Sequence, residues 1–161
     1  MTELLEALYR GQQDRVQELL AQAGELNVFE AAAFGRTERL RGLLDEEPAR
    51  ANAFGDDGFH LLGLACFFGR LNAARLLLER GADVNMLSRN EHIQTAAIHA
   101  AAASGETAAD ESTRYELVKL VLDHGADPNL PQPGGFRAID AARQSGDERL
   151  ERLLKEHGAE D

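Results

Sequence analysis

The stretch that decides the fold is Leu76-Leu77-Leu78-Glu79-Arg80-Gly81-Ala82-Asp83-Val84-Asn85. The pattern returns as Leu120-Val121-Leu122-Asp123-His124-Gly125-Ala126-Asp127-Pro128-Asn129 and, less regularly, over residues 153–161. Asn52 and Asn85 are 33 residues apart, as are Gly125 and Gly158, whereas Gly81 and Gly125 are 44 apart. A unit that recurs at a nearly constant period of this size predicts a solenoid built from stacked repeats.

The most regular unit shows how one repeat is built. It begins Asp57-Gly58-Phe59-His60-Leu61-Leu62-Gly63-Leu64-Ala65-Cys66-Phe67-Phe68-Gly69. Asp57-Gly58 predicts a tight turn, and Gly69 ends a short inner helix over 61–68. A longer outer helix over 72–80 follows and is closed by Gly81.

This unit resembles the ankyrin repeat, whose consensus reads DGxTPLHLAAxxGHLEIVKLLL. The resemblance covers nearly the whole chain and implies an all-α ankyrin-repeat solenoid of about five helix pairs with short β-hairpin fingers. The chain is then a single domain, 1–161. Its approximate units are 1–25, 26–52, 53–85, 86–129 and 130–161.

Two insertions account for the longer fourth unit. One extends the finger over 87–93, and the other lies between the two helices over 106–113. The second has almost nothing apolar to bury and is expected to be the least ordered part of the chain. The first unit lacks a finger, because only residues 21–25 join it to the second.

The outer helices at the two ends carry charged residues where internal ones are apolar. The last outer helix has Glu151 and Lys155 at the positions where the preceding outer helix has Val118 and Leu122. The first outer helix has two charged residues, Arg15 among them, at positions that are apolar in the internal outer helices. A polar outer face caps a solenoid and keeps it soluble. We therefore expect a complete stack that is capped at both ends.

Composition narrows the kinds of partner. The chain has 161 residues and a net charge of −11, which disfavours nucleic acid and anionic membrane surfaces. The one cysteine rules out an internal disulfide and, with no signal peptide or membrane span, favours a cytoplasmic protein. Fifteen arginines against two lysines point to a bacterial source.

The resemblance implies that another protein binds in a concave groove formed by the fingers and inner helices. The two residues before each turn glycine are expected to face this groove. These pairs are Tyr9-Arg10, Ala33-Phe34, Phe67-Phe68, Ala103-Ser104 and Gln144-Ser145. We therefore predict partner contacts at Tyr9, Phe34, Phe67, Phe68 and Ser104, since exposed aromatic residues carry much interface energy. The alternative is that Phe34 and Phe67 tuck between helices as core.

The fingers supply further candidates. Phe54 at a finger tip is expected to contact the partner, and the neighbouring Asp56 and Asp57 to meet basic groups on it. His92 lies in the extended finger and is expected to be exposed. Phe59 and Phe136 each follow a finger glycine, where an aromatic residue is expected to stack along the finger row.

The histidines do not form a recognisable metal site. The resemblance implies that the His99 ring forms a hydrogen bond with the backbone of a neighbouring finger. The positions that correspond to His99 in the other units hold Phe29, Gly63 and Asp140. His60 is expected to replace part of the missing histidine contacts. No zinc spacing, phosphate-binding loop or calcium loop is present. We therefore predict no metal, no cofactor and no catalytic residue.

The leading hypothesis is a non-catalytic, monomeric module that binds a partner protein and modulates it. One alternative is a structural protein that self-associates through its phenylalanine-rich groove. Another is a small metal-binding enzyme using His60, His92, His99 and Cys66, which the expected lack of a deep pocket disfavours.

Overall fold

The computed structural model describes residues 1–104 and 110–161. The helices are α1 (Glu3–Tyr9), α2 (Gln13–Gln22), α3 (Val28–Ala33), α4 (Thr37–Glu46), α5 (Leu61–Phe67), α6 (Leu71–Glu79), α7 (Ala97–Ala103), α8 (Glu111–Asp123), α9 (Ala138–Ser145) and α10 (Glu148–Glu156), with a 3-10 turn η1 (Pro48–Asn52). Short and long helices alternate as the repeat pattern predicts. The all-α solenoid is therefore confirmed.

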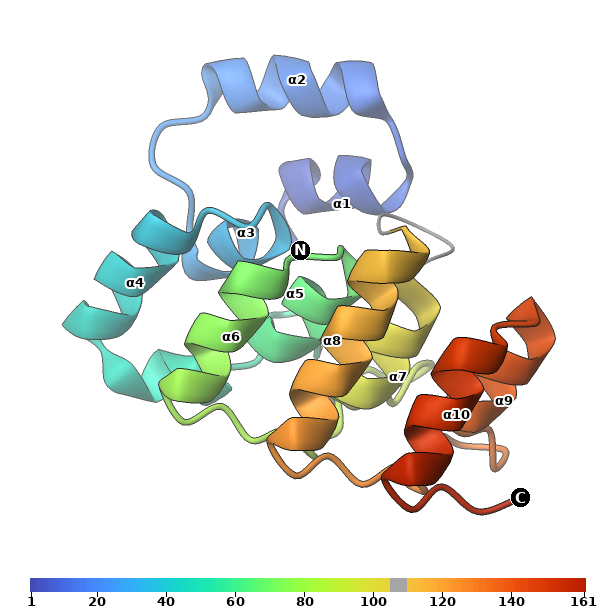
Figure 1. Ribbon diagram of the computed structural model, residues 1–161. Helices are drawn as coiled ribbons and strands as arrows, with labels where there is room; N and C mark the ends of the chain where they lie inside the picture. The colour runs from blue at the N-terminus through green and yellow to red at the C-terminus, as the bar shows by residue number, and fades with distance from the viewer. Residues whose placement is uncertain (105–109) are drawn as a thin grey trace.

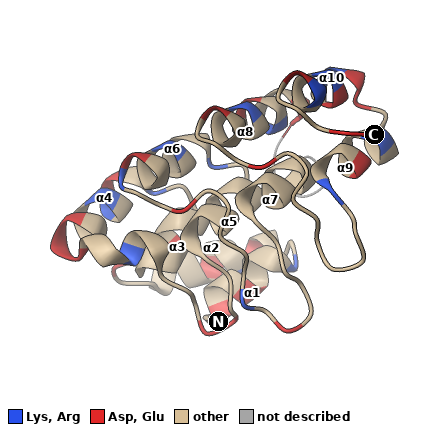
Figure 2. Ribbon diagram, turned by 90° about the horizontal axis from the view of Figure 1, so that it is seen from below, with Lys and Arg blue, Asp and Glu red and all other residues tan. Residues whose placement is uncertain are grey.

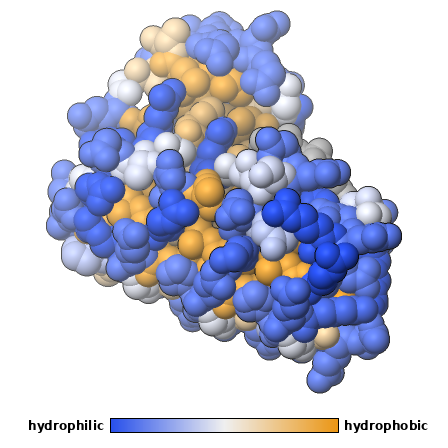
Figure 3. All heavy atoms as spheres, in the orientation of Figure 1, coloured by the Kyte–Doolittle hydropathy of each residue, from blue (hydrophilic) through white to orange (hydrophobic). Residues whose placement is uncertain are grey.

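The helices form two rows (Figures 1 and 2). Inner helices α3, α5, α7 and α9 pack against one another in order, and so do outer helices α4, α6, α8 and α10. Leucine and alanine side chains fill the space between the rows, with Leu77, Ile98 and Leu117 fully buried. The outer row turns its charged residues to solvent, so this face is largely hydrophilic (Figure 3).

The first helix pair is oriented differently from the others. α2 lies across the end of the stack and packs chiefly on α1, instead of lying alongside α4 (Figure 1). Val16 of α2 and Leu4 and Ala7 of α1 form a separate small core, which Phe34 joins from the next unit. This orientation leaves space between α2 and the following inter-helix turns, which the sequence pattern did not predict.

The terminal outer helices present ion pairs where another repeat would stack. Glu151 of α10 bonds Arg143 at 2.9 Å and Lys155 at 3.1 Å. At the other end, Arg15 of α2 pairs with Glu18 and Glu3. Both end faces are therefore polar.

The fingers are tight loops. In the described part of the chain no β-strand is assigned, and one isolated antiparallel bridge joins Phe54 to His60. Gly58 has a positive φ of 81°, and its carbonyl accepts from the Arg89 amide of the next finger at 2.7 Å. A Cβ atom on Gly58 would lie 2.6 Å from that backbone, so this position requires glycine.

The repeated asparagine links each unit to the next. Asn85 Nδ2 donates to the Gly125 carbonyl at 3.1 Å, and its Oδ1 accepts from the Asp127 amide at 2.8 Å. Asn52 and Asn129 make the equivalent pair of bonds, to residues 81 and 83 and to residues 158 and 160. The recurring motif thus encodes a ladder of inter-repeat hydrogen bonds.

Replacing Asn85 by alanine should remove one rung of this ladder. Two hydrogen bonds at about 1 kcal/mol each predict a loss of roughly 1–2 kcal/mol in unfolding free energy, because the site is solvent-accessible. Urea denaturation of Asn85→Ala, with the exposed Asn72→Ala as control, measures this loss. Equal stability of the two variants would show that the ladder does not couple the units.

The inner helices share one pattern of capping hydrogen bonds at their N-termini. A hydrogen bond joins the residue before each helix to the residue three positions later, in one direction or both. These pairs are Asn27 with Glu30, His60 with Gly63, Ala96 with His99, and Arg137 with Asp140. The bonds satisfy backbone amides that lack partners at the start of a helix.

The two histidines play this capping role from opposite positions. His60 Nδ1 accepts from the Gly63 amide at 3.0 Å, whereas His99 Nδ1 accepts from the Ala96 amide at 3.0 Å. The His60 ring occupies the space beside Gly63, where a Cβ atom would lie 3.1 Å from its Cε1. The position equivalent to His99 in the second unit is Glu30. The assignment to Phe29 was wrong by one residue.

The insertion between α7 and α8 is partly helical. Residues 105–109, which include the expected turn glycine Gly105, lie outside the described residues. Asp110 caps α8 by accepting from the Thr113 amide at 2.7 Å, and residues 111–113 form the first helical turn. The prediction that residues 111–113 lie between the two helices was therefore wrong, because an N-cap aspartate followed by Glu111 favours a helix start.

Candidate functional site

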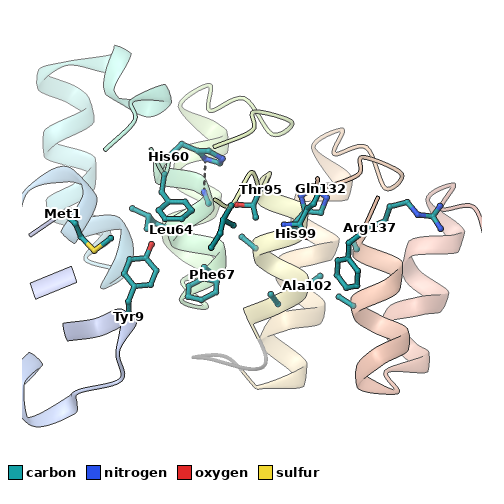
Figure 4. Close-up of a pocket in the computed structure, with 18 of the residues that line it drawn as sticks. Met1, Tyr9, His60, Leu64, Phe67, Thr95, His99, Ala102, Gln132 and Arg137 are labelled. Atoms are coloured by element: carbon teal, nitrogen blue, oxygen red, sulfur yellow. Dashed lines mark hydrogen bonds between the residues drawn. The ribbon is translucent and has the colours of Figure 1, made fainter. Parts of the chain in front are cut away.

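A largely apolar cavity of about 660 Å³ runs along the concave side of the inner helices. We call it the groove cavity. Residues from α1, α5, α7 and α9 and from the fingers line it (Figure 4). Small side chains form its base on α7 and α9, at Ala100, Ala103 and Ala141. Aromatic residues form its walls, at Tyr9, Phe59, Phe67 and Phe136.

An aromatic cluster closes the N-terminal end of this cavity. The Tyr9 ring lies 5.8 Å from Phe67, 5.0 Å from Phe68 and 6.2 Å from Phe59, measured between ring centroids. The Phe67 and Phe68 rings meet edge to face at 5.0 Å. Such pairs stabilise beyond the area they bury. The cluster anchors α1 to α5 and fixes the wall against which a ligand would pack.

Burial favours the neutral form of three titratable groups in the cavity, which Glu6, Arg10 and Arg137 also line. It raises the pKa of Tyr9 well above its usual value, with a smaller contribution from Asp57. It lowers the pKa of His60, with the backbone of Thr95 and Met86 opposing, and that of His99, with the Leu130 carbonyl opposing. The His99 ring also bonds that carbonyl through Nε2 at 2.7 Å. These three groups are neutral near pH 7 and suit an apolar ligand.

Only some of the residues predicted to face the groove line the groove cavity. Tyr9 and Phe67 line the groove cavity, but Phe68 is only 3% exposed and belongs to a core cluster with Leu5 and Leu64. Ser104 is completely buried, and its Oγ donates to the Ala101 carbonyl at 2.6 Å. Phe68 and Ser104 were therefore wrongly placed on the groove surface. Adjacent helical residues point about 100° apart, so Phe67 can face the cavity while Phe68 turns into the core.

Phe34 was predicted either to contact the partner or to pack in the core, and the structure shows features of both. Its half-buried ring packs on the small core of α1 and α2, yet it also borders a second cavity beside the turns. It does not line the groove cavity.

The finger candidates lie apart from the groove cavity. The Phe54 ring is covered by the Arg89 guanidinium at 4.1 Å and meets His60 edge-on. Asp57 organises its own turn by accepting from the Phe59 amide at 3.0 Å, whereas Asp56 is exposed. His92 is exposed, and its amide donates to Asn90 Oδ1 at 2.9 Å. These side chains stay candidates for contacts outside the cavity.

Several lining residues were not among the predicted contacts. Phe59 and Phe136, expected only to stack along the fingers, line the groove cavity, as does Leu64. Ile93 is 51% exposed at its finger edge. Ser88 and Asn90 hold that extended finger in place: Ser88 Oγ donates to the Ile93 carbonyl at 2.7 Å, and Asn90 Nδ2 reaches the Asp57 carbonyl at 2.8 Å. The sequence feature that could have indicated this lining residue was an apolar side chain in an inserted finger.

Groups suited to metal or thiol chemistry are dispersed. Within residues 1–104 and 110–161, no three His, Cys, Asp or Glu side chains gather at a possible metal site. Cys66 is fully buried, which raises the pKa of its thiol to about 12. No helix in the described part of the chain has both the length and the apolar character needed to cross a bilayer.

Comparisons with known proteins agree with this architecture. The family model for ankyrin repeats (3 copies) matches residues 4–88 and 29–132. The rat ankyrin repeat and SAM domain-containing protein 6 is 31% identical over 80% of this chain. The fruit-fly E3 ubiquitin-protein ligase Ufd4 is 32% identical over 70%, and the Arabidopsis putative E3 ubiquitin-protein ligase XBAT35 is 28% identical over 83%.

The chain covers only a small part of these relatives: 14% of the rat protein, 4% of Ufd4 and 27% of XBAT35. Their names describe whole proteins, so the similarity concerns the repeats. These relatives come from animals and plants and give no support to a bacterial source. The repeat motif, the two rows of helices and the matched family model together show that the chain belongs to the ankyrin-repeat family.

Proposed function

We propose that this chain is a non-catalytic module that holds an apolar segment of a partner protein in its groove cavity and thereby modulates that partner. Ankyrin repeats generally serve as protein-interaction modules. The cytoplasm, which the single buried thiol favours, is the proposed compartment, and the monomer is the proposed binding form.

The groove cavity is the observation that carries this proposal. It is largely apolar and is lined by aromatic and small side chains from α1 and from the inner helices α5, α7 and α9. Exposed apolar surface of this kind on a folded chain marks an interaction site. Its width is set by alanines on α7 and α9, so a side chain of the partner can pack directly against the helix backbone.

A bulky residue at the base of the groove should block binding. The experiment selects peptides from a random dodecapeptide display library on the wild-type protein and measures their affinity by calorimetry. Ala103→Trp should weaken these peptides tenfold or more by filling the cavity, which is within the range of a central interface contact. Glu116→Trp, on the exposed face of α8, is the matched control and should bind normally.

Three results would contradict the proposal. The first is failure to enrich any peptide, and the second is equal binding to both tryptophan variants. The third is a concentration-dependent dimer in light scattering that Ala103→Trp abolishes, because the groove would then be occupied by a second copy. Thermal unfolding followed by circular dichroism checks that both variants are folded.

A further inference from the structure

A second cavity, of about 750 Å³, lies where the inter-helix turns of the first three units meet. We call it the turn cavity. α2, which lies across the end of the stack (Figure 1), lines one side of this cavity. Arg10, Arg36 and Arg70, one from each turn, line it together with Gln13 and Gln17. No Asp or Glu is among its lining residues.

The arginines of the turn cavity are only partly neutralised. Arg10 pairs with Glu6 at 2.6 Å, but in the described part of the chain neither Arg36 nor Arg70 makes an ion pair. Arg70 Nε donates to the Ala33 carbonyl at 2.9 Å, which holds this half-buried guanidinium in place. Burial lowers the pKa of Arg70, and the positive charge of Arg36 lowers it further. Two like charges thus face one cavity in a chain of net charge −11.

The residues at the cap positions of the helices beside this cavity carry no negative charge. Gln12, Arg36 and Arg70 precede α2, α4 and α6, and none of them caps its helix with a side-chain hydrogen bond. By contrast, Asp110 and Asp147 cap α8 and α10. The later outer helices thus have a carboxylate at the cap position that α2, α4 and α6 lack, whereas Asp14 and Glu38 lie in the first turns of α2 and α4.

The turn cavity and the groove cavity are adjacent. Tyr9, Arg10 and Phe67 line both, so the aromatic cluster forms the wall between an apolar space and a basic one. A chain lying in the groove with an apolar residue beside Phe67 would bring its next residues to the arginines. A carboxylate there would satisfy guanidinium groups whose charge is otherwise unpaired.

We propose that the partner segment carries an acidic side chain directly next to its apolar residues, and that Arg36 and Arg70 bind this carboxylate in the turn cavity. The inference rests on the proposed function, since it names the chemistry of the partner held in the groove. Because the chain as a whole is acidic, recognition is local to this end of the groove.

The peptides selected on the wild-type protein test this inference. They should be enriched in Asp or Glu next to apolar residues. Changing that acidic residue to its amide should weaken binding to wild type about tenfold, and binding to Arg36→Gln by a clearly smaller factor, because only Arg70 still faces the carboxylate in that variant. Arg36 is exposed and its substitution should preserve the fold, whereas Arg75→Gln on α6 is the arginine control and should behave as wild type.

The outcomes separate this inference from the proposed function. Peptides that bind wild type, fail on Ala103→Trp and lack any acidic preference would overturn the inference and leave the function standing. So would an acid-to-amide change with the same effect on wild type and Arg36→Gln. Peptides that bind Ala103→Trp as well as wild type would overturn both.

Discussion

Replacing Phe68 by alanine should lower the free energy of unfolding by about 3–5 kcal/mol, the usual cost of deleting a buried phenylalanine ring. Phe68 is 3% exposed and contacts Tyr9 and Phe67 with its ring. A domain of this size is stable by only about 5–15 kcal/mol, so the variant should unfold at much lower urea concentration. Chemical denaturation with linear extrapolation measures the loss.

Phe67→Ala is the matched control, because it removes the same ring from the neighbouring position. Phe67 is half-buried and lines the groove cavity, so its loss should cost roughly half as much stability, in proportion to the apolar area it buries. Its effect on peptide binding should be the larger one. Equal destabilisation by the two variants would show that the two rings do not differ in burial.

Removing the positive charge of Arg114 should be comparably damaging. The Arg114 side chain is 5% exposed and bonds Asp147, itself 12% exposed, at 2.6 Å and Ser145 Oγ at 3.2 Å. This pair ties the start of α8 to the turn between α9 and α10. Arg114→Met leaves the Asp147 carboxylate without its cation and should cost about 3–5 kcal/mol in unfolding free energy.

The double variant Arg114→Met, Asp147→Ser should regain most of that stability. Serine retains an oxygen that can cap α10, where Asp147 Oδ1 accepts from the Leu150 amide at 2.9 Å, and it leaves no buried charge. Arg114 Nε has no hydrogen-bond partner among the described residues, so the native pair already carries a desolvation cost. A double variant no more stable than Arg114→Met would show that the charges are not coupled.

The same pair predicts how stability depends on pH. Burial alone would raise the pKa of Asp147, but the Leu150 amide and Arg114 outweigh it and hold the pKa below its usual value. A carboxylate with a lowered folded-state pKa stabilises the fold above its unfolded pKa of about 4. This contribution is lost as the pH falls through the folded-state pKa. The unfolding free energy of wild type should therefore fall relative to that of the double variant as the pH drops below about 4. Above about pH 4 the difference between the two proteins should stay constant.

The regularities of the fold follow from local sequence. Glycines 81 and 125 end outer helices because a positive φ is easy for glycine, and the recurring asparagine lies at a constant distance beyond each. Alternation of short and long helices, the polar terminal faces and the bond from His99 to the neighbouring finger could all be predicted from the repeat pattern. Each depends on residues within one unit or on the constant relation between units.

Tertiary packing decided the features that make the two cavities. Phe67 and Phe68 are chemically identical neighbours, and the packing of α1 and α3 on α5 determines which ring is buried. Arg114 belongs to a segment that reads as part of a loop until Asp147, 33 residues later, is brought against it. The tilt of α2, which brings three arginines to one space, depends on how its few apolar residues fit α1. Local propensity and repeat period determined the helices and their order, whereas burial and charge proximity depend on contacts between distant residues, which no local pattern specifies.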